Sequence, residues 1–253
     1  MNYFAYPTAA ERYAKGRPFF HPLAIKMIES VCCESGLVDR ALDVGCGTGQ
    51  SSLALLQVAD EIVGLDSSAE MLSHAAQHAR IRYVEARAEQ MPFDDASFGL
   101  MTVAGAFHWF DQRQFMREAQ RVLQPRGWLA IYNDGFTGRM TGNSSYEKWN
   151  SEQYLVRYPT PPRNNVFLSD ADASAYGFAP GGSEKFMHEI EFTPSQLVSY
   201  QLAQTNVIQA VETGREDVQS VAHWLLNGVQ PLFTAAVEKF VFSCQIRFLK
   251  RSE

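Results

Sequence analysis

The sequence lacks the features that mark several broad classes of protein. No run approaches the roughly 20 apolar residues that a helix needs to span a bilayer, and the N-terminus has no basic stretch followed by an apolar one. The four cysteines show neither CxxC spacing nor a paired framework, which predicts reduced thiols and argues against a metal site built from them. We therefore expect a cytoplasmic protein that binds no metal through its cysteines.

The chain also lacks an excess of positive charge. Its formal net charge of -6 argues against a general affinity for nucleic-acid phosphates. With 253 residues, of which 46% are hydrophobic and 20% charged, it can bury a large core as one α/β domain or two small ones. The composition favours a small-molecule partner rather than nucleic acid or a membrane, and it leaves monomer and homodimer open.

Three glycines at alternate positions follow a short apolar run in residues 41 to 50, which are Ala-Leu-Asp-Val-Gly-Cys-Gly-Thr-Gly-Gln. Glycine tolerates positive φ and has no Cβ, so Gly45, Gly47 and Gly49 let the main chain turn sharply and approach a ligand closely. The pattern predicts a strand, a tight turn and the start of a helix, whose N–H groups could face an anionic or polar cofactor. Its G-x-G-x-G spacing differs from the G-x-G-x-x-G of dinucleotide-binding dehydrogenases.

Apolar runs alternate with segments of helical periodicity along most of the chain, which predicts a parallel sheet with helices between its strands. Strands are expected at residues 40–44, 61–66, 81–86, 98–106, 128–132, 186–192 and 240–249. Helices are expected at residues 23–33, 51–59, 68–79, 112–123, 194–212 and 216–227. In such a sheet, ligands bind beyond the carboxyl ends of the strands.

Polar residues follow the second and third expected strands. Asp66 ends the second strand, where it could accept hydrogen bonds from both hydroxyls of a ribose. The alternative is that it caps the helix that opens at Ser67, and the two roles are compatible. Ala88 and Glu89 come just after the third strand and could line an adenine pocket, whereas the rival interpretation is a plain loop.

Two segments depart from this alternation. Residues 133–185 hold many glycines, prolines and aromatics, and a structureless loop of that length is unusual in a compact domain. We therefore expect short helices there, one near residues 145–158, that form a substrate lid. Residues 1–22 interleave Tyr and Arg with Gly and Pro, which suits an arm over the cofactor; an aromatic arm packed on the body of the protein is the alternative.

Taken together, these motifs resemble the class I S-adenosylmethionine-dependent methyltransferases of the type 11 group. The matching stretches are residues 42–49, 63–66, 88–93, 95–101 and 121–127. The resemblance covers nearly all of residues 5–250 and implies a single methyltransferase domain over residues 1–253. Its expected fold is α/β, a Rossmann-like, doubly wound, mostly parallel seven-stranded sheet with an antiparallel last strand and a lid insertion after strand five. The implied cofactor is S-adenosyl-L-methionine, contacted by Tyr13, Arg17, Asp43, Gly45, Cys46, Gly47, Asp66, Ser67, Ala88, Glu89, Ala104 and Gly105.

Two further features are similar to a narrower branch, the trans-aconitate methyltransferase-like proteins. Tyr13 to Pro18 resembles that branch's arm over the cofactor carboxylate, although this chain continues as Phe-Phe-His-Pro where the branch has x-Tyr-Pro. Ala106 to Asp111 resembles its Phe-His-Trp-Phe-Asp run just after strand four. The lid carries no signature that identifies a substrate.

Methyl transfer from a sulfonium is an in-line displacement, and positioning alone can lower such a barrier by roughly 7 to 11 kcal/mol. His108 is the candidate catalytic residue: it would hold a carboxylate acceptor, or act as a base toward a phenol or carbon acid, and a structural role is the alternative. Trp109, Tyr154 and Arg157 are the candidate substrate-binding residues. The sequence thus predicts methylation of a small molecule, on a carboxylate oxygen or on a phenolic or carbon centre. A protein that binds the cofactor without turnover is the alternative.

Overall fold

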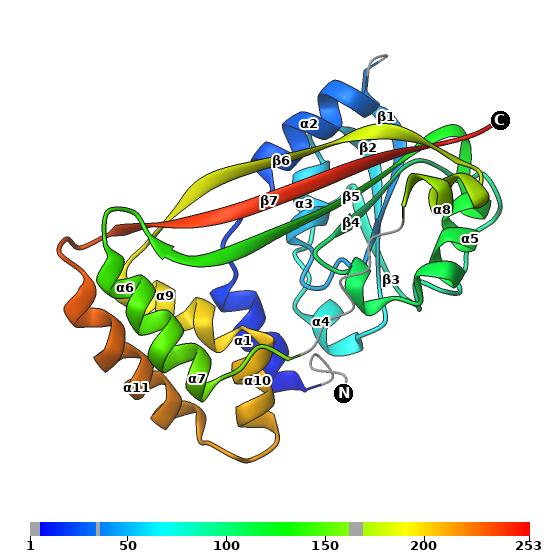
Figure 1. Ribbon diagram of the computed structural model, residues 1–253. Coiled ribbons are helices and arrows are strands. Elements are labelled where there is room, and N and C mark those ends of the chain that lie inside the picture. The colour runs from blue at the N-terminus through cyan, green and yellow to red at the C-terminus, as the bar shows by residue number, and fades with distance from the viewer. Residues whose placement is uncertain (1–5, 34–35, 162–168) are drawn as a thin grey trace. The chain divides into compact units, whose positions relative to one another are not determined.

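The computed structural model describes residues 6–33, 36–161 and 169–253 (Figure 1). These residues form two compact units. Unit 1 comprises the described parts of residues 1–18, 135–162 and 186–243, and unit 2 those of residues 19–134, 163–185 and 244–253. The expectation of a single domain stays a prediction.

One sheet contains seven strands in the order β3-β2-β1-β4-β5-β7-β6. The strands are β1 (Val38–Val44), β2 (Ala59–Asp66), β3 (Ile81–Glu85), β4 (Phe98–Ala104), β5 (Leu123–Met140), β6 (Phe178–Phe192) and β7 (Glu238–Arg251). Strands β1 to β5 pair in parallel, and β7 runs antiparallel to its neighbours (Figure 1). The predicted Rossmann-like sheet with an antiparallel last strand is confirmed.

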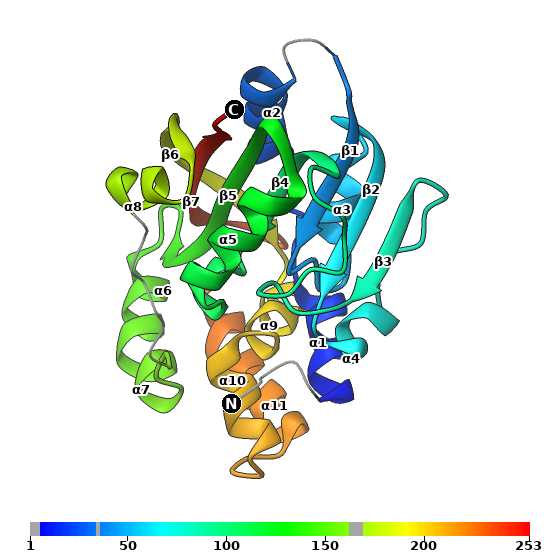
Figure 2. The ribbon, with the colours of Figure 1, turned by 90° about the vertical axis from the view of Figure 1, so that its right-hand side faces the viewer.

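Helices of unit 2 lie on both faces of the sheet, and α5 covers β4 and β5 on one of them (Figure 2). They are α2 (Pro22–Cys32), α3 (Gln50–Leu55), α4 (Ala69–Ser73), α5 (Gln112–Val122) and α8 (Asp170–Ala175), with a short turn η1 (Phe107–Trp109). Unit 1 contains α1 (Pro7–Gly16), α6 (Ser144–Trp149), η2 (Asn150–Tyr154), α7 (Leu155–Arg157), α9 (Pro194–Leu202), α10 (Thr205–Glu212), α11 (Val218–Val229) and η3 (Gln230–Leu232). None of the helices among the described residues has the length and apolar character that crossing a bilayer requires.

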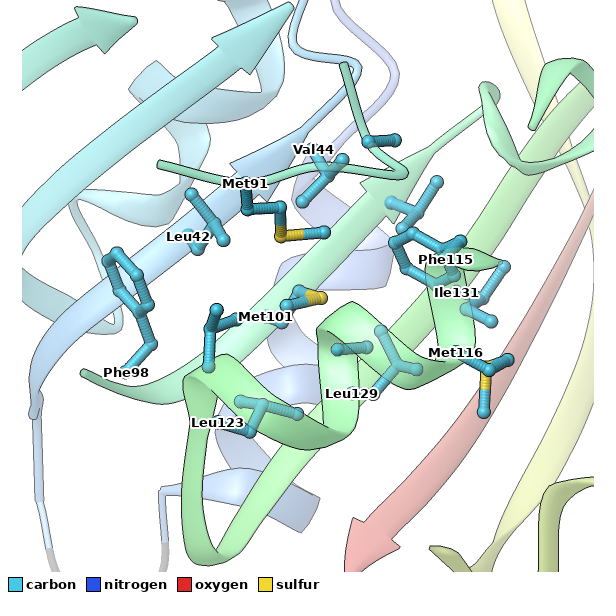
Figure 3. Packing of buried hydrophobic residues seen from close by; sticks show 14 of the residues in the cluster. Leu42, Val44, Met91, Phe98, Met101, Phe115, Met116, Leu123, Leu129 and Ile131 are labelled. Carbon is cyan, nitrogen blue, oxygen red and sulfur yellow. The ribbon is translucent and has the colours of Figure 1, made fainter. Parts of the chain in front are cut away.

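The core of unit 2 lies on both faces of the sheet. Leu42 and Met101 pack with α5 on one face (Figure 3), whereas their chain neighbours Ala41 and Leu100 pack with α2 and α3 on the other. All four are fully buried. Strands buried on both faces are continuously apolar, which is why these runs showed no polar alternation in the sequence.

One predicted helix is much shorter than expected. Residues 68–79 have helical periodicity, yet α4 ends at Ser73. Beyond it, the Ala76 N–H donates to the carbonyl of Thr48 at 3.2 Å, and the Ala76 carbonyl accepts from the Tyr83 hydroxyl at 2.7 Å. These contacts with distant residues use the backbone groups that a longer helix would have paired. The helix expected over residues 194–212 is likewise divided, into α9 and α10, where Gln204 is extended.

The fifth and sixth strands are longer than expected. Strand β5 continues to Met140 and β6 begins at Phe178, so the segment 133–185 starts and ends inside strands. The expected helix near 145–158 is present as α6, η2 and α7. Strand β7 is the neighbour of both long strands and supplies their backbone partners from the far end of the chain, which local composition cannot reveal. The function of 133–185 as a lid stays a prediction.

Candidate cofactor site

The turn after β1 is fastened to the end of β2 by backbone hydrogen bonds. The N–H groups of Gly45 and Cys46 donate to the carbonyl of Leu65 at 2.7 and 3.1 Å. Gly45, Gly47 and Gly49 have φ values of 72°, 54° and 75°. Because side-chain-bearing residues rarely adopt this region, the alternating glycines are a conformational requirement of the turn.

Two of these glycines are also approached too closely to carry a side chain. A Cβ at Gly45 would lie 2.5 Å from the Cβ of Ala106, so the loop after β4 touches the turn. A Cβ at Gly49 would lie 2.2 Å from the hydroxyl oxygen of Tyr83, whose ring also packs on Gly64. Sequence reasoning missed Tyr83. The available signal was Gly64 itself, because glycine inside a buried strand often marks a close approach.

Asp43 lies beneath the turn and is completely buried. Its Oδ2 accepts hydrogen bonds from Ser51 Oγ at 2.6 Å and Ser52 Oγ at 2.7 Å, and its Oδ1 accepts one from Thr102 Oγ1 at 3.1 Å. Burial raises the pKa of this carboxyl, while the hydroxyl donors oppose the rise. In the structure Asp43 joins the start of α3 to β4 and is fully buried. Its predicted contact with the cofactor stays a prediction.

Asp66 ends β2 beside the turn. Its Oδ2 accepts from the Gly47 N–H at 2.8 Å, and its Oδ1 accepts from the Ser68 N–H at 2.9 Å. Ser68 is the N-cap of α4, so Asp66 binds the residue that caps the helix and is not the cap itself. The contact of Asp66 with a ribose stays a prediction. Burial raises the pKa of the Asp66 carboxyl, and the backbone N–H donors oppose the rise. Ser67 is exposed next to it.

The loop after β3 meets both neighbouring loops. The Ala86 N–H donates to the main-chain carbonyl of Asp66 at 3.0 Å. Glu89 Oε1 accepts from the Asp111 N–H at 2.9 Å, at the start of α5, and Ala88 between them is 5% exposed. The loop that was predicted to line an adenine pocket is therefore held beside Asp66 at one end and against α5 at the other.

The loop after β4 carries the predicted catalytic residue. Strand β4 ends at Ala104, and Gly105 turns the chain with a φ of 65° while its N–H donates to the Tyr132 carbonyl at 2.8 Å. The turn η1 then places the His108 and Trp109 rings with centroids 4.6 Å apart. Trp109 is 42% exposed, which is high for so large an apolar side chain.

Cys46, within the glycine turn, is 5% exposed. Burial raises the pKa of its thiol well above the usual value, and the charges of Asp43 and Asp66 raise it further. The thiol is therefore neutral and unsuited to act as a nucleophile. The contact of Cys46 with the cofactor stays a prediction.

The predicted arm residues belong to unit 1. Tyr13 lies on α1 and Arg17 follows that helix, with its guanidinium carbon 5.2 Å from the Tyr13 ring centroid and 5.6 Å from that of Tyr200. Helix α1 packs on α9. The alternative of an aromatic arm that packs on other residues is thus present within unit 1, and the contact of Tyr13 and Arg17 with the cofactor stays a prediction.

The predicted substrate residues of unit 1 have partners of their own. Tyr154 is buried, and its hydroxyl donates to Asn206 Oδ1 at 3.3 Å. Arg157 hydrogen-bonds Glu216 and lies 4.6 Å above the Trp224 ring. Their assignment to substrate binding stays a prediction, and a substrate would compete with these contacts.

Within unit 2, the described contacts bring together the glycine turn, Asp66 and the loops that follow β3 and β4. These segments all lie at the carboxyl ends of the parallel strands β1 to β4, the edge at which α/β sheets bind ligands. This edge therefore carries the glycine turn and the Asp66 carboxylate, which are joined by a hydrogen bond, and the loop after β4 with the exposed indole of Trp109.

Comparison with known proteins agrees with this geometry. Residues 42–131 match the family described as a methyltransferase domain. The chain is similar to the demethylmenaquinone methyltransferase of Chlorobaculum tepidum (29% identity, covering 61% of this chain and 62% of the relative) and to the malonyl-[acyl-carrier protein] O-methyltransferase of Pectobacterium atrosepticum (35% identity, covering 42% of each).

These matches are partial in sequence but nearly complete in fold. The chain spans 42% to 62% of the length of the curated relatives. A solved structure from Anaeromyxobacter dehalogenans, provisionally named a type II methyltransferase, superposes with a TM-score of 0.70 at 23% identity and covers 92% of this chain and 97% of its own. At this identity the structural likeness shows the fold alone.

Proposed function

We propose that this chain is a class I S-adenosylmethionine-dependent methyltransferase, with S-adenosyl-L-methionine as its cofactor, and that it transfers a methyl group to a small-molecule acceptor. The observation that carries the proposal is the hydrogen bond of 2.8 Å between the Gly47 N–H and Asp66 Oδ2. It joins the glycine turn to a carboxylate at one edge of the sheet, and these are the groups that we assign to the methionine and ribose portions of the cofactor.

The residues present fit this cofactor. Each oxygen of a carboxylate has two lone pairs, so we propose that Asp66 also accepts hydrogen bonds from the ribose hydroxyls, beside those from the Gly47 and Ser68 N–H groups. Gly45 and Gly47 are assigned to the methionine portion. Ala88 and Glu89 are assigned to the adenine. Ser67, Cys46, Ala104 and Gly105 complete the proposed walls, with Tyr13 and Arg17 as the proposed arm.

The bound cofactor would supply a methyl group attached to a positively charged sulfur. The task of the protein is to align the acceptor with that methyl carbon and to exclude water. We assign the acceptor to the loop after β4, where Trp109 offers an exposed aromatic face and His108 an imidazole. We also assign Tyr154 and Arg157 to binding of the acceptor.

The acceptor atom that we propose is a carboxylate oxygen. A carboxylate is already nucleophilic, so His108 would act as a hydrogen-bond donor that holds it and not as a base. The alternative is a phenolic or carbon centre with His108 as the base. One relative is named for O-methylation of a malonyl-[acyl-carrier protein] and another for methylation of demethylmenaquinone, so the names of the relatives do not point to a single acceptor.

The proposal is tested in two steps. Calorimetry with S-adenosylhomocysteine should show one site in the wild-type chain, and the absence of binding would overturn the cofactor assignment. The chain is then incubated with methyl-labelled cofactor and panels of small carboxylic acids and phenols. Label that is released from the product by mild alkali identifies a methyl ester and supports the carboxylate; alkali-stable label supports the alternative. Binding without labelled product from any panel would indicate a cofactor-binding protein without turnover.

A further inference from the structure

We propose that Glu118 and Arg121 of α5 are positioning residues that set the preference of the site for adenine, by holding the loop of residues 86–97. The inference rests on the proposed function, because Ala88 and Glu89 in this loop are the assigned adenine wall. Neither Glu118 nor Arg121 is expected to touch the cofactor. They act through the main chain of the loop.

Arg121 and Glu118 bind that main chain directly. The two terminal nitrogens of Arg121 donate to the carbonyls of Met91 at 2.9 Å and Phe93 at 2.6 Å, and one of them also donates to Asp95 Oδ1 at 3.0 Å. Glu118 Oε2 accepts from the Met91 N–H at 2.7 Å. Both backbone polar groups of Met91, two residues after Glu89, are therefore bound by one turn of α5.

The two side chains also fix each other. Arg121 Nε donates to Glu118 Oε1, and Arg121 Nη2 donates to Glu118 Oε2, each at 2.8 Å. Such bidentate pairs have well-defined geometry. The hydrogen bonds from Arg121 lower the pKa of Glu118, so its carboxylate remains ionised at neutral pH. The side chains are 19% and 31% exposed, so water competes only partly for these bonds.

The same helix holds the loop at a second point. At the start of α5, the Asp111 N–H donates to Glu89 Oε1 at 2.9 Å. The 11 residues of α5 extend over about 16 Å, and Phe115, Met116 and Ala119 fix the helix to the sheet with completely buried side chains. Glu89 and Met91 are thus attached to the two ends of one rigid helix, and Ala88 directly precedes these attachments, which restricts how far the segment can move when a different base is offered.

The test compares the affinities of two ligands that differ only in the base, S-adenosylhomocysteine and S-inosylhomocysteine, by calorimetry. In Arg121→Ala, we expect the affinity for S-adenosylhomocysteine to fall roughly tenfold while that for S-inosylhomocysteine changes little, so that discrimination is lost. Arg117→Ala, an exposed arginine on the same helix, is the matched control and should behave as wild type.

Two variants of Glu118 separate positioning from general stability. Glu118→Gln keeps an acceptor for the Met91 N–H and should retain the discrimination, whereas Glu118→Ala should lose it. Hydrogen exchange of the Met91 amide, measured without ligand, should accelerate in Glu118→Ala but not in Glu118→Gln. This second readout does not depend on cofactor binding, and it remains available if Arg121→Ala does not fold.

The outcomes distinguish this inference from the proposed function. A wild-type chain that binds neither ligand overturns both. A wild-type chain that prefers S-adenosylhomocysteine, with Arg121→Ala and Glu118→Ala either unchanged or weakened equally toward both ligands, overturns the positioning role alone. Loss of discrimination in both alanine variants, with the Gln variant and the Arg117 control unaffected, supports it.

Discussion

The backbone N–H of Gly47 and the carboxylate of Asp66 are hydrogen-bonded at 2.8 Å. Gly47 follows β1 and Asp66 ends β2, and these two strands are parallel neighbours with Val44 opposite Leu65. The turn after β1 and the acidic end of β2 therefore meet at the same edge of the sheet. The carboxylate is therefore oriented before any ligand binds, which reduces the entropy that binding would otherwise cost.

Replacement of Asp66 should affect cofactor binding more than folding. Asp66→Ala removes the proposed ribose acceptor and leaves the Gly47 N–H without its partner, so we expect the affinity for S-adenosylhomocysteine to fall by about tenfold to a hundredfold, as for charged hydrogen bonds. Isothermal titration calorimetry measures this affinity. Asp60→Ala, an exposed residue on the same strand, is the control. Equal affinities in the two variants would contradict the ribose assignment.

Gly45→Ala should destabilise the chain through both strain and contact. Its φ is 72°, as is that of Gly214, but only at Gly45 does an added Cβ meet another atom, Ala106 Cβ at 2.5 Å. We expect Gly214→Ala to lower the free energy of unfolding by about 1 to 2 kcal/mol through φ alone, and Gly45→Ala by about 1 to 3 kcal/mol more. Chemical denaturation of the two variants and the wild type measures these losses in the free energy of unfolding. An equal loss would show that the turn can move away from the loop after β4.

The burial of Asp43 should produce a dependence of stability on pH. Its pKa is raised in the folded chain above the ordinary 3.8, so the native state binds the proton more tightly than the unfolded state does. The protonated Asp43 carboxyl therefore contributes to the stability of the folded chain fully below pH 3.8, and this contribution is lost as the pH rises through the raised pKa. The difference in unfolding free energy between wild type and Asp43→Asn should accordingly decline across that window, as measured by denaturation at a series of pH values. A difference that grows with pH would show that the hydroxyl donors outweigh burial.

His108→Gln separates the two proposed mechanisms. Glutamine can donate a hydrogen bond but cannot accept a proton near neutral pH, so methyl transfer to a carboxylate should fall by about tenfold or less. Loss of a general base would instead cost about 10²- to 10⁴-fold and would remove the inflection that a titrating base gives in the pH profile of the rate. Initial rates with labelled cofactor between pH 5 and 9 provide the comparison. The larger loss would favour the phenolic or carbon acceptor.

Local sequence was sufficient for the parts of the protein that depend on local physics. Alternating glycines predicted the turn after β1 because positive φ is a property of single residues, and all three have it. Buried apolar runs predicted the parallel strands, and their chain order placed Asp66 at the edge where ligands bind.

Only the tertiary structure decided which polar groups meet. Asp43 is buried and accepts a hydrogen bond from Thr102, which lies 59 residues away along the chain. The role of Tyr83 and the attachment of Met91 to Arg121, 30 residues apart, also depend on which strands and helices become neighbours. Hydrogen bonds between distant residues have no local periodicity or composition, so the sequence alone determined the turn and the strands, and the packing of the sheet determined what supports them.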